Sequence, residues 1–319
     1  MPETASSRPP EKPGKPGKAP GSGPGPAAAD RHVPLSHPEK VLYPETGFTK
    51  GDVVDYYTAV AEVLLPQLRD RPVSFVRAPG GVTSRPFMAK HVPPGTPDWV
   101  TVCEVHRVDG STDRQVVVQD LPTLRWAANL AALELHVPQW RLPHEGRADR
   151  LVFDLDPGAP ATVVECCEVA LRLRDELAAD GLESYAKTSG AKGLHLLVPL
   201  RPTDAAAVAG YAERLAREVS GALPELAVHR VPKHLRTGRV FIDHSQNAWT
   251  RTTAAPYTLR AKSRPTVSTP VTWDEVAGCA QPGDLVHTAG DVPARLDRYG
   301  DLLAPLLDPA RAGRLPNGG

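Results

Sequence analysis

Residues 151–158 read LVFDLDPG, and this stretch decides how the chain is organised. A short run of Val, Phe and Leu that stops at Pro-Gly predicts a β-strand. Side chains two positions apart on a strand point to the same face, so Asp154 and Asp156 emerge side by side. Two such carboxylates repel each other unless a cation lies between them. The stretch therefore predicts a Mg²⁺ or Mn²⁺ site, and leaves open a solvated strand end, an Asx turn or a structural Ca²⁺ loop.

A regular order of elements follows this strand. The pattern predicts, in turn, a helix at 161–181, strands at 183–189 and 194–200, a second helix at 204–223 and a strand at 239–243. This is the β-α-β-β-α-β order of the ferredoxin-like fold, in which the first and last strands are neighbours. We therefore expect Asp243 to join Asp154 and Asp156 in a site for two metal ions, although a strand-end cap would also explain it.

The residues before this core predict an N-terminal α/β module over 32–150, packed on a catalytic core over 151–306. Thr49 is a candidate cap for a helix that runs to about Leu68, strands are expected at 72–78 and 114–119, and residues 123–136 predict a mostly buried helix. The Pro, Gly, Ala and Lys of residues 1–31 predict a disordered tail, and residues 307–319 a frayed end.

The composition limits where the protein works and what it binds. Lys plus Arg and Asp plus Glu both number 37, so any nucleic acid must be bound by local basic patches. The four cysteines show no CxxC spacing, which fits a reducing compartment and no zinc site. No signal peptide and no apolar run of about 18 residues is present, so we expect a soluble cytoplasmic protein without a membrane partner.

Two further patterns favour a polyphosphate substrate. The loop SGAKGLH, residues 189–195, lies between the two middle strands, where glycines allow backbone N–H groups to face a phosphate and Lys192 adds charge. It lacks the spacing of a Walker A loop, and by itself could be a glycine-rich hairpin. The basic runs HRVPKHLRTGR and LRAKSR flank the last strand, although such runs are often only solvated surface.

Together the motifs DLDPG, SGAKGLH, RTGRVFIDHSQN and APYTLRAKSRPTVSTPVTWDEV resemble the polymerase domain of bacterial ligase D. That family is the archaeo-eukaryotic primase-like polymerase of bacterial non-homologous end joining, and the likeness runs from about residue 33 to 305. It implies a nucleotidyltransferase that adds nucleotides, preferably ribonucleotides, to DNA ends and gaps. Its partners would be nucleoside triphosphates, DNA with a 5′-phosphate, a separate ligase and a Ku-type end-binding protein, at the nucleoid.

The resemblance also assigns residues by position. Asp154, Asp156 and Asp243 match the family's metal triad for Mn²⁺ or Mg²⁺. The matches to its nucleotide-binding residues are His136, Ser189, Lys192, His195 and Arg260. The matches to its DNA-binding residues are Lys40 and Lys50 for a 5′-phosphate, Phe87 for template stacking, and Lys233 and Arg236. Met88 departs from the family, which commonly has a second aromatic residue there.

Several alternatives compete with these assignments. His136 could simply end a helix, and Lys40 and Lys50 could be solvated. A haloacid-dehalogenase-like phosphatase also begins with a strand ending in DxD, but needs a Thr after the second Asp and a late acidic pair, where this chain has DLDPGAP and FIDHSQN. A non-catalytic DNA-end-binding module predicts loss of a carboxylate or of the loop lysine. Since all of these residues are present, we expect a polymerase.

Overall fold

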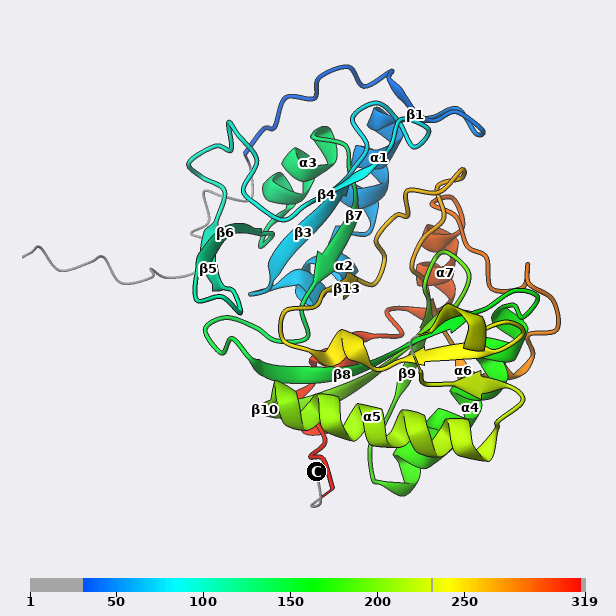
Figure 1. The fold of residues 1–319 in the computed structure, drawn as a ribbon. Helices are drawn as coiled ribbons and strands as arrows, with labels where there is room; N and C mark the ends of the chain where they lie inside the picture. Colours follow the sequence, from blue (N-terminus) through cyan, green and yellow to red (C-terminus); the bar gives the residue numbers. More distant parts are fainter. Residues whose placement is uncertain (1–30, 231, 317–319) are drawn as a thin grey trace, which may run out of the picture.

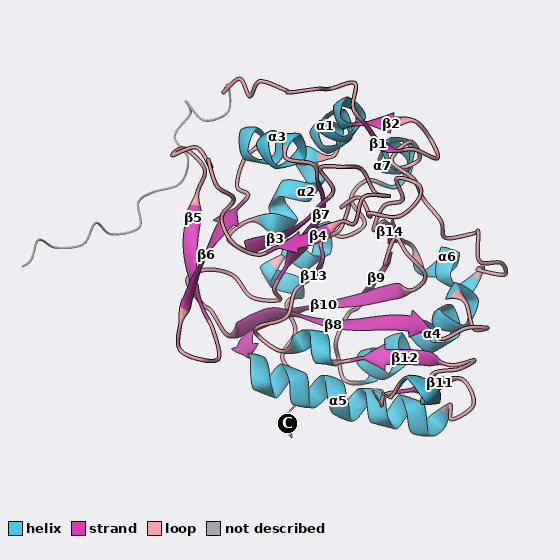
Figure 2. Cartoon of the chain, turned by 45° about the horizontal axis from the view of Figure 1, so that its top comes forward, coloured by secondary structure: helices cyan, strands magenta, loops and turns pink. Residues whose placement is uncertain are grey.

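Four strands form the predicted sheet in the computed structural model, which describes residues 31–230 and 232–316. They are β8 (Arg147–Pro157), β9 (Tyr185–Thr188), β10 (Leu194–Asp204) and β12 (Val240–Asp243). Their order is β12-β8-β10-β9 with antiparallel neighbours, so the first and last strands of the motif are adjacent, as predicted. The short strands β11 (Ala227–Val228) and β14 (Pro270–Val271) extend the two edges (Figure 2).

Both helices of the motif cover one face of this sheet (Figure 1). Helix α4 (Val163–Ala179) begins at Thr162 in a capping box with Glu165, and α5 (Ala205–Ala222) begins at Asp204, whose side chain accepts two amide hydrogen bonds. Phe153 and Leu155 of β8 pack into the core under these helices. Because side chains alternate along a strand, Asp154 and Asp156 face the other way, toward the N-terminal module.

The N-terminal module is a second sheet with its own helices. The strands run in the order β13-β7-β3-β6-β5 with β4 beside β3, and β1 and β2 form a separate hairpin. Their bounds are β1 Val41–Tyr43, β2 Phe48–Thr49, β3 Pro72–Arg77, β4 Phe87–Ala89, β5 Val102–His106, β6 Thr112–Val117, β7 Ala132–Val137 and β13 Thr253–Ala254. The helices are α1 Lys50–Ala59, α2 Ala61–Leu68 and α3 Leu121–Asn129, and α1 begins at Thr49, the predicted cap.

Two expectations for this module are wrong. The helix from Thr49 is divided at Val60, where the chain turns and buries Val60 and Leu64 in the module's core. The helix expected over 123–136 ends at Asn129, because Ala131 takes a left-handed conformation with φ of 54°. Residues 132–137 then form strand β7, in which Leu133 and its alternate neighbours are buried in the core.

The chain returns to the N-terminal module after β12. Strand β13 pairs with β7. The hydrophobic core of the N-terminal module also contains the buried residues Ala255, Tyr257, Leu259 and Val267. Helices α6 (Trp273–Ala277) and α7 (Val292–Tyr299) follow. The division of the chain at residue 150 stays a prediction. Except for Arg31, the predicted tail lies outside the described residues, and so do the last three residues of the chain. Within residues 31–230 and 232–316, no helix is long and apolar enough to span a membrane.

Candidate active site

Three acidic side chains meet on the open face of the β8 sheet. In the strand register Asp154 lies directly opposite Asp243 of β12, and Asp156 follows two positions along the same face. On its other side Asp154 lies opposite His195 of β10. A pocket of about 200 Å³ opens here, and it is lined by His136, Asp154, Asp156, Ser189, Ala191, His195, Gln246, Thr252, Thr253, Ala254 and Arg260. The topology therefore brings residues from distant parts of the sequence to one place.

Two buried side chains, His195 and Lys187, form a chain of polar contacts that ends at Asp154. The Nε2 of His195 lies 3.3 Å from Oδ1 of Asp154, and the Nδ1 of the same ring lies 3.1 Å from Nζ of Lys187. Burial lowers the pKa of Lys187 well below its ordinary value, and burial together with Lys187 also lowers the pKa of His195. Burial alone would raise the pKa of Asp154, but His195, with smaller contributions from Lys187 and Arg260, outweighs it and holds that pKa below its ordinary value. Asp154 is therefore kept as a carboxylate.

Asp156 and Asp243 differ from Asp154 in their surroundings. Desolvation, together with the neighbouring Asp154 and Asp243, raises the pKa of Asp156 to about 6. One oxygen of Asp243 accepts hydrogen bonds from the amide and hydroxyl of Ser245 at 3.0 and 2.6 Å, and the other accepts from Gln246 at 2.9 Å. The mutual repulsion that raises the pKa of Asp156 is what a bound cation would relieve.

The donor chemistry of these carboxylates fits a hard divalent cation. Among the described residues no group of three or more His, Cys, Asp or Glu side chains is already arranged to hold an ion. Asp154 instead lies within ion-pair distance of His195. Asp243 accepts hydrogen bonds from Ser245 and Gln246. Mg²⁺ usually takes only one or two carboxylates and completes its shell with water and substrate phosphates, so a closed protein cage is not required.

The glycine-rich loop lies beside the carboxylates and is closed by its own hydrogen bonds. Ser189 Oγ accepts from the amides of Ala191 and Gly193, each at 3.1 Å. Gly190 has φ of 69°, and a Cβ there would lie 2.7 Å from the Cγ of Arg260, so no larger residue fits. Lys192 is exposed and lines a neighbouring pocket of about 450 Å³ instead of the carboxylate pocket.

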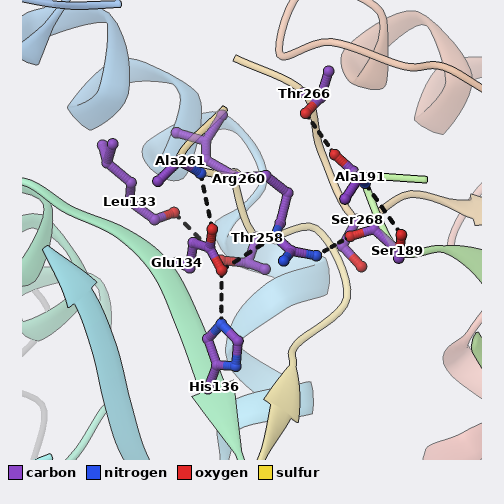
Figure 3. A network of polar contacts seen from close by, with 12 residues as sticks. Leu133, Glu134, His136, Ser189, Ala191, Thr258, Arg260, Ala261, Thr266 and Ser268 are labelled. Carbon is purple, nitrogen blue, oxygen red and sulfur yellow. Dashed lines mark hydrogen bonds and ion pairs between the residues drawn. The ribbon is translucent and has the colours of Figure 1, made fainter. Parts of the chain in front are cut away.

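A buried carboxylate joins the two sides of the pocket (Figure 3). Glu134 of β7 is 6% exposed and accepts hydrogen bonds from Nε2 of His136 at 2.8 Å and from the amide of Ala261 at 2.9 Å. The Nε of Arg260 lies 3.1 Å from the same carboxylate, close enough for an ion pair but without a hydrogen bond. Arg260 Nη1 in turn donates to the backbone oxygen of Ser189. Burial would raise the pKa of Glu134, but His136 and Arg260 outweigh it and lower that pKa to about 2.

Of the candidate DNA-binding residues whose side chains are described, none lines the carboxylate pocket. Lys40 and Lys50 are adjacent, since the Lys50 amide donates to the Lys40 carbonyl at 2.8 Å across the β1–β2 hairpin. The side chain of Lys50 is buried and donates to Ser36 Oγ at 3.0 Å, and burial followed by the charge of Lys40 lowers its pKa. Such a site, with two cations near each other, favours an anion.

The remaining DNA-binding candidates belong to both modules. On β4, Phe87 is 46% exposed and Met88 is 45% exposed, and the guanidinium of Arg77 lies 5.7 Å from the Phe87 ring. The guanidinium of Arg236 lies 3.6 Å from the ring of Phe241, beside the strand that carries Asp243. The backbone of Lys233 begins a 3-10 helix, Lys233–Leu235.

Sequence reasoning missed Glu134 and Lys187. Glu134 was hidden because the segment was interpreted as a helix, whereas alternation in ALELHV would have put Glu134 and His136 on one strand face. Lys187 falls in a strand that was predicted, but nothing in the local sequence tells that this lysine is buried beside His195. Only the pairing of β9 with β10 brings the two together.

Comparison with known proteins identifies the family. A family model described as the LigD primase-polymerase domain matches residues 49–303. The chain belongs to the LigD primase-polymerase family. It is 44% identical over 278 residues to the multifunctional non-homologous end joining protein LigD of Mycolicibacterium smegmatis, a match that covers 86% of this chain and 36% of that protein. It is 31% identical over 280 residues to the bifunctional non-homologous end joining protein LigD of Bacillus subtilis, covering 85% of this chain and 44% of that protein.

A solved structure supports the same assignment. The polymerase domain from Mycobacterium tuberculosis ligase D, in complex with DNA, matches with a TM-score of 0.82 and 41% identity, covering 89% of this chain and all of that chain. The predicted α/β primase-polymerase fold is thereby confirmed. As a LigD primase-polymerase domain the chain is a metal-dependent nucleotidyltransferase, and the phosphatase and the non-catalytic alternatives are not favoured. It spans a little over a third of the M. smegmatis relative and less than half of the B. subtilis one.

Proposed function

We propose that this chain adds nucleotides, preferably ribonucleotides, to DNA ends and short gaps during the repair of double-strand breaks by end joining. One observation carries the proposal: the carboxylates of Asp154 and Asp156 share a pocket with Ser189, His195 and Arg260. Carboxylates for cations and basic groups for phosphates are the two requirements of nucleotidyl transfer. The relatives named for non-homologous end joining support the setting of this activity.

The residues of the pocket, with Asp243 and Lys192 beside it, divide into those that would bind cations and those that would bind the nucleotide. Asp154, Asp156 and Asp243 would hold Mn²⁺ or Mg²⁺, two ions in all, which supply the positive charge that activates the attacking oxygen and neutralises the phosphates. Arg260, held between Glu134 and the Ser189 carbonyl, presents its guanidinium to the triphosphate. His136, Ser189, Lys192 and His195 complete the nucleotide contacts of the proposal. The buried position of Glu134 keeps His136 and Arg260 oriented before substrate arrives.

The DNA contacts of the proposal lie outside that pocket. Lys40 and Lys50 would bind the 5′-phosphate at the far side of a gap. The exposed ring of Phe87 would stack on the template strand, without the aromatic neighbour whose place Met88 takes. Lys233 and Arg236 would contact the DNA backbone. A DNA ligase and a Ku-type end-binding protein are the proposed partners, at the nucleoid in the cytoplasm.

A primer-extension experiment tests the proposal. Gapped and blunt DNA substrates are incubated with each of the eight nucleotides and with Mn²⁺ or Mg²⁺, and the products are separated on a gel. We expect extension, with ribonucleotides winning direct competition against their deoxy counterparts and with Mn²⁺ more effective than Mg²⁺. A small generic phosphate ester serves as the phosphatase control and should not be hydrolysed. Failure to extend any of these primers would contradict the proposal.

Substitution of a carboxylate shows whether this pocket performs the reaction. Asp154→Ala should reduce extension by about a thousand-fold or more while the fold is retained, since a lost cation contact costs several kcal/mol of transition-state stabilisation. Asp297→Ala, at an exposed aspartate of α7, is the matched control and should extend primers normally. Normal extension by Asp154→Ala would rule out the assigned site.

A further inference from the structure

Lys187 is a buried lysine that the proposed reaction does not use. It is 1% exposed, lies on β9, and is paired in register with His195 of β10, which is in turn opposite Asp154 of β8. The three residues thus form a row across three neighbouring strands. Burying a lysine is costly unless its hydrogens are bonded, so its contacts indicate what it does there.

Lys187 acts as the donor in its hydrogen bonds to Ser268 and His195. Its Nζ lies 2.5 Å from Ser268 Oγ, which lies 2.9 Å from the carbonyl oxygen of Thr188. A carbonyl can only accept, so the Ser268 hydroxyl donates its hydrogen to Thr188 and is left to accept one from Nζ. A lysine has further hydrogens at Nζ, and Nδ1 of His195, 3.1 Å away, is the next acceptor within reach.

The other side of the His195 ring faces an acceptor. Its Nε2 lies 3.3 Å from Oδ1 of Asp154, and a carboxylate can only accept. A neutral ring whose Nδ1 faces a donor and whose Nε2 faces an acceptor carries its hydrogen on Nε2. The imidazole therefore links the two residues, with a hydrogen bond to Lys187 at Nδ1 and a close polar contact with Asp154 at Nε2.

We propose that Lys187 is a positioning residue for nucleotide addition: it holds His195 in the Nε2–H form, and until the nucleotide binds, His195 restrains one oxygen of Asp154 so that the other is presented to the pocket. The inference rests on the proposed function, which assigns Asp154 to the cation site. Groups behind a metal ligand commonly affect metal affinity or activity by 10- to 100-fold, about the size of effect expected here. A purely structural lysine would leave the His195 ring unaffected.

The direct test reads the His195 ring itself. Histidine is labelled with ¹⁵N, and long-range ¹H–¹⁵N spectra of the metal-free protein are recorded for the wild type and for Lys187→Met. His195→Asn identifies the signals of this ring among the 11 histidines of the chain. The wild type should show a protonated Nε2 and an unprotonated Nδ1, and Lys187→Met should shift both signals toward a mixture of the two forms. Unchanged ring signals in Lys187→Met would overturn the proposal.

Two further variants separate the donor from the rest of the side chain. Lys187→Arg keeps a donor at this position and should show the Nε2–H form of His195. This measurement tests the donor role even if Lys187→Met fails to fold. A loss of that form in folded Lys187→Arg would count against a donor role. Lys90→Met, the same change at an exposed lysine of the N-terminal module, is the matched control and should leave the ring signals as they are.

Cation binding and kinetics give the functional consequence. Mn²⁺ titration followed by electron paramagnetic resonance should show 10- to 100-fold weaker binding in Lys187→Met, and primer extension should lose kcat while the KM for nucleotide changes less than about twofold. Unchanged Mn²⁺ affinity despite altered ring signals would refute the positioning role. If Asp154→Ala extends primers normally, the proposed function fails, whereas the coupling between Lys187 and His195 is still judged from the spectra.

Discussion

Replacing Glu134 by glutamine removes the negative charge that joins strand β7 to Arg260 while keeping nearly the same side-chain shape. In the folded protein the pKa of Glu134 is lowered from its ordinary value of 4.5 to about 2, because His136 and Arg260 outweigh the effect of burial. A group whose pKa is lowered by folding stabilises the fold above its unfolded pKa and loses that contribution as the pH falls through its folded pKa. The stabilisation by the Glu134 carboxylate is therefore lost as the pH falls from about 4.5 to about 2.

The size of the contribution follows from the shift. Each pKa unit corresponds to about 1.4 kcal/mol, so the Glu134 carboxylate contributes about 3 kcal/mol to the free energy of unfolding at pH 7. At pH 3 the unfolded state already holds the proton, and roughly 1 kcal/mol is left. Glutamine does not titrate, so the stability difference between wild type and Glu134→Gln should shrink by about 2 kcal/mol between pH 7 and pH 3.

Urea unfolding at the two pH values measures this difference, followed by the fluorescence of the five tryptophans. Taking the difference between two proteins at each pH cancels the titrating groups that do not interact with residue 134, provided that the unfolded states are alike. Glu225→Gln is the matched control, because the Glu225 side chain is 94% exposed and should give no pH-dependent difference. A Glu134→Gln difference that is equal at pH 7 and pH 3 would refute the role of the charge.

Three other expectations concern the DNA side of the protein. Lys40→Ala should weaken binding to gapped DNA with a recessed 5′-phosphate and barely affect the same DNA with a 5′-hydroxyl, which comparison of dissociation constants checks; equal losses would mean a general backbone contact. Lys50→Ala should show the same selectivity and also a lower melting temperature, because its buried amine bonds Ser36. Deleting residues 1–30, too poor in apolar residues to form a core, should leave turnover on a short gap nearly unchanged, and a large drop would mean that this segment contacts DNA.

Residue periodicity and the order of the elements were enough to predict the sheet that contains β8 and the face that carries the carboxylates. Strand alternation in LVFDLD sends Phe153 and Leu155 into the helix-covered core and leaves Asp154 and Asp156 on the opposite face. The order of the elements then put Asp243 beside Asp154, because the split βαβ motif makes its outer strands neighbours. Both inferences use short-range periodicity and a topological rule, and neither needs knowledge of side-chain packing. The helix expected through His136 failed because the chain reverses at Ala131, where no glycine or proline marks the change.

The polar groups that surround the carboxylates could not be found without the three-dimensional structure. Glu134, Arg260 and the Ser189 loop are far apart in the sequence. They meet because the chain returns after β12 to pair β13 with β7. Lys187 becomes a partner of His195 through the register of β9 and β10, and its burial depends on the segment that carries Ser268. Burial and charge pairing depend on distances in space between elements that local sequence does not encode. For that reason the carboxylates could be found from a strand pattern, whereas the groups that orient them and set their pKa values could not.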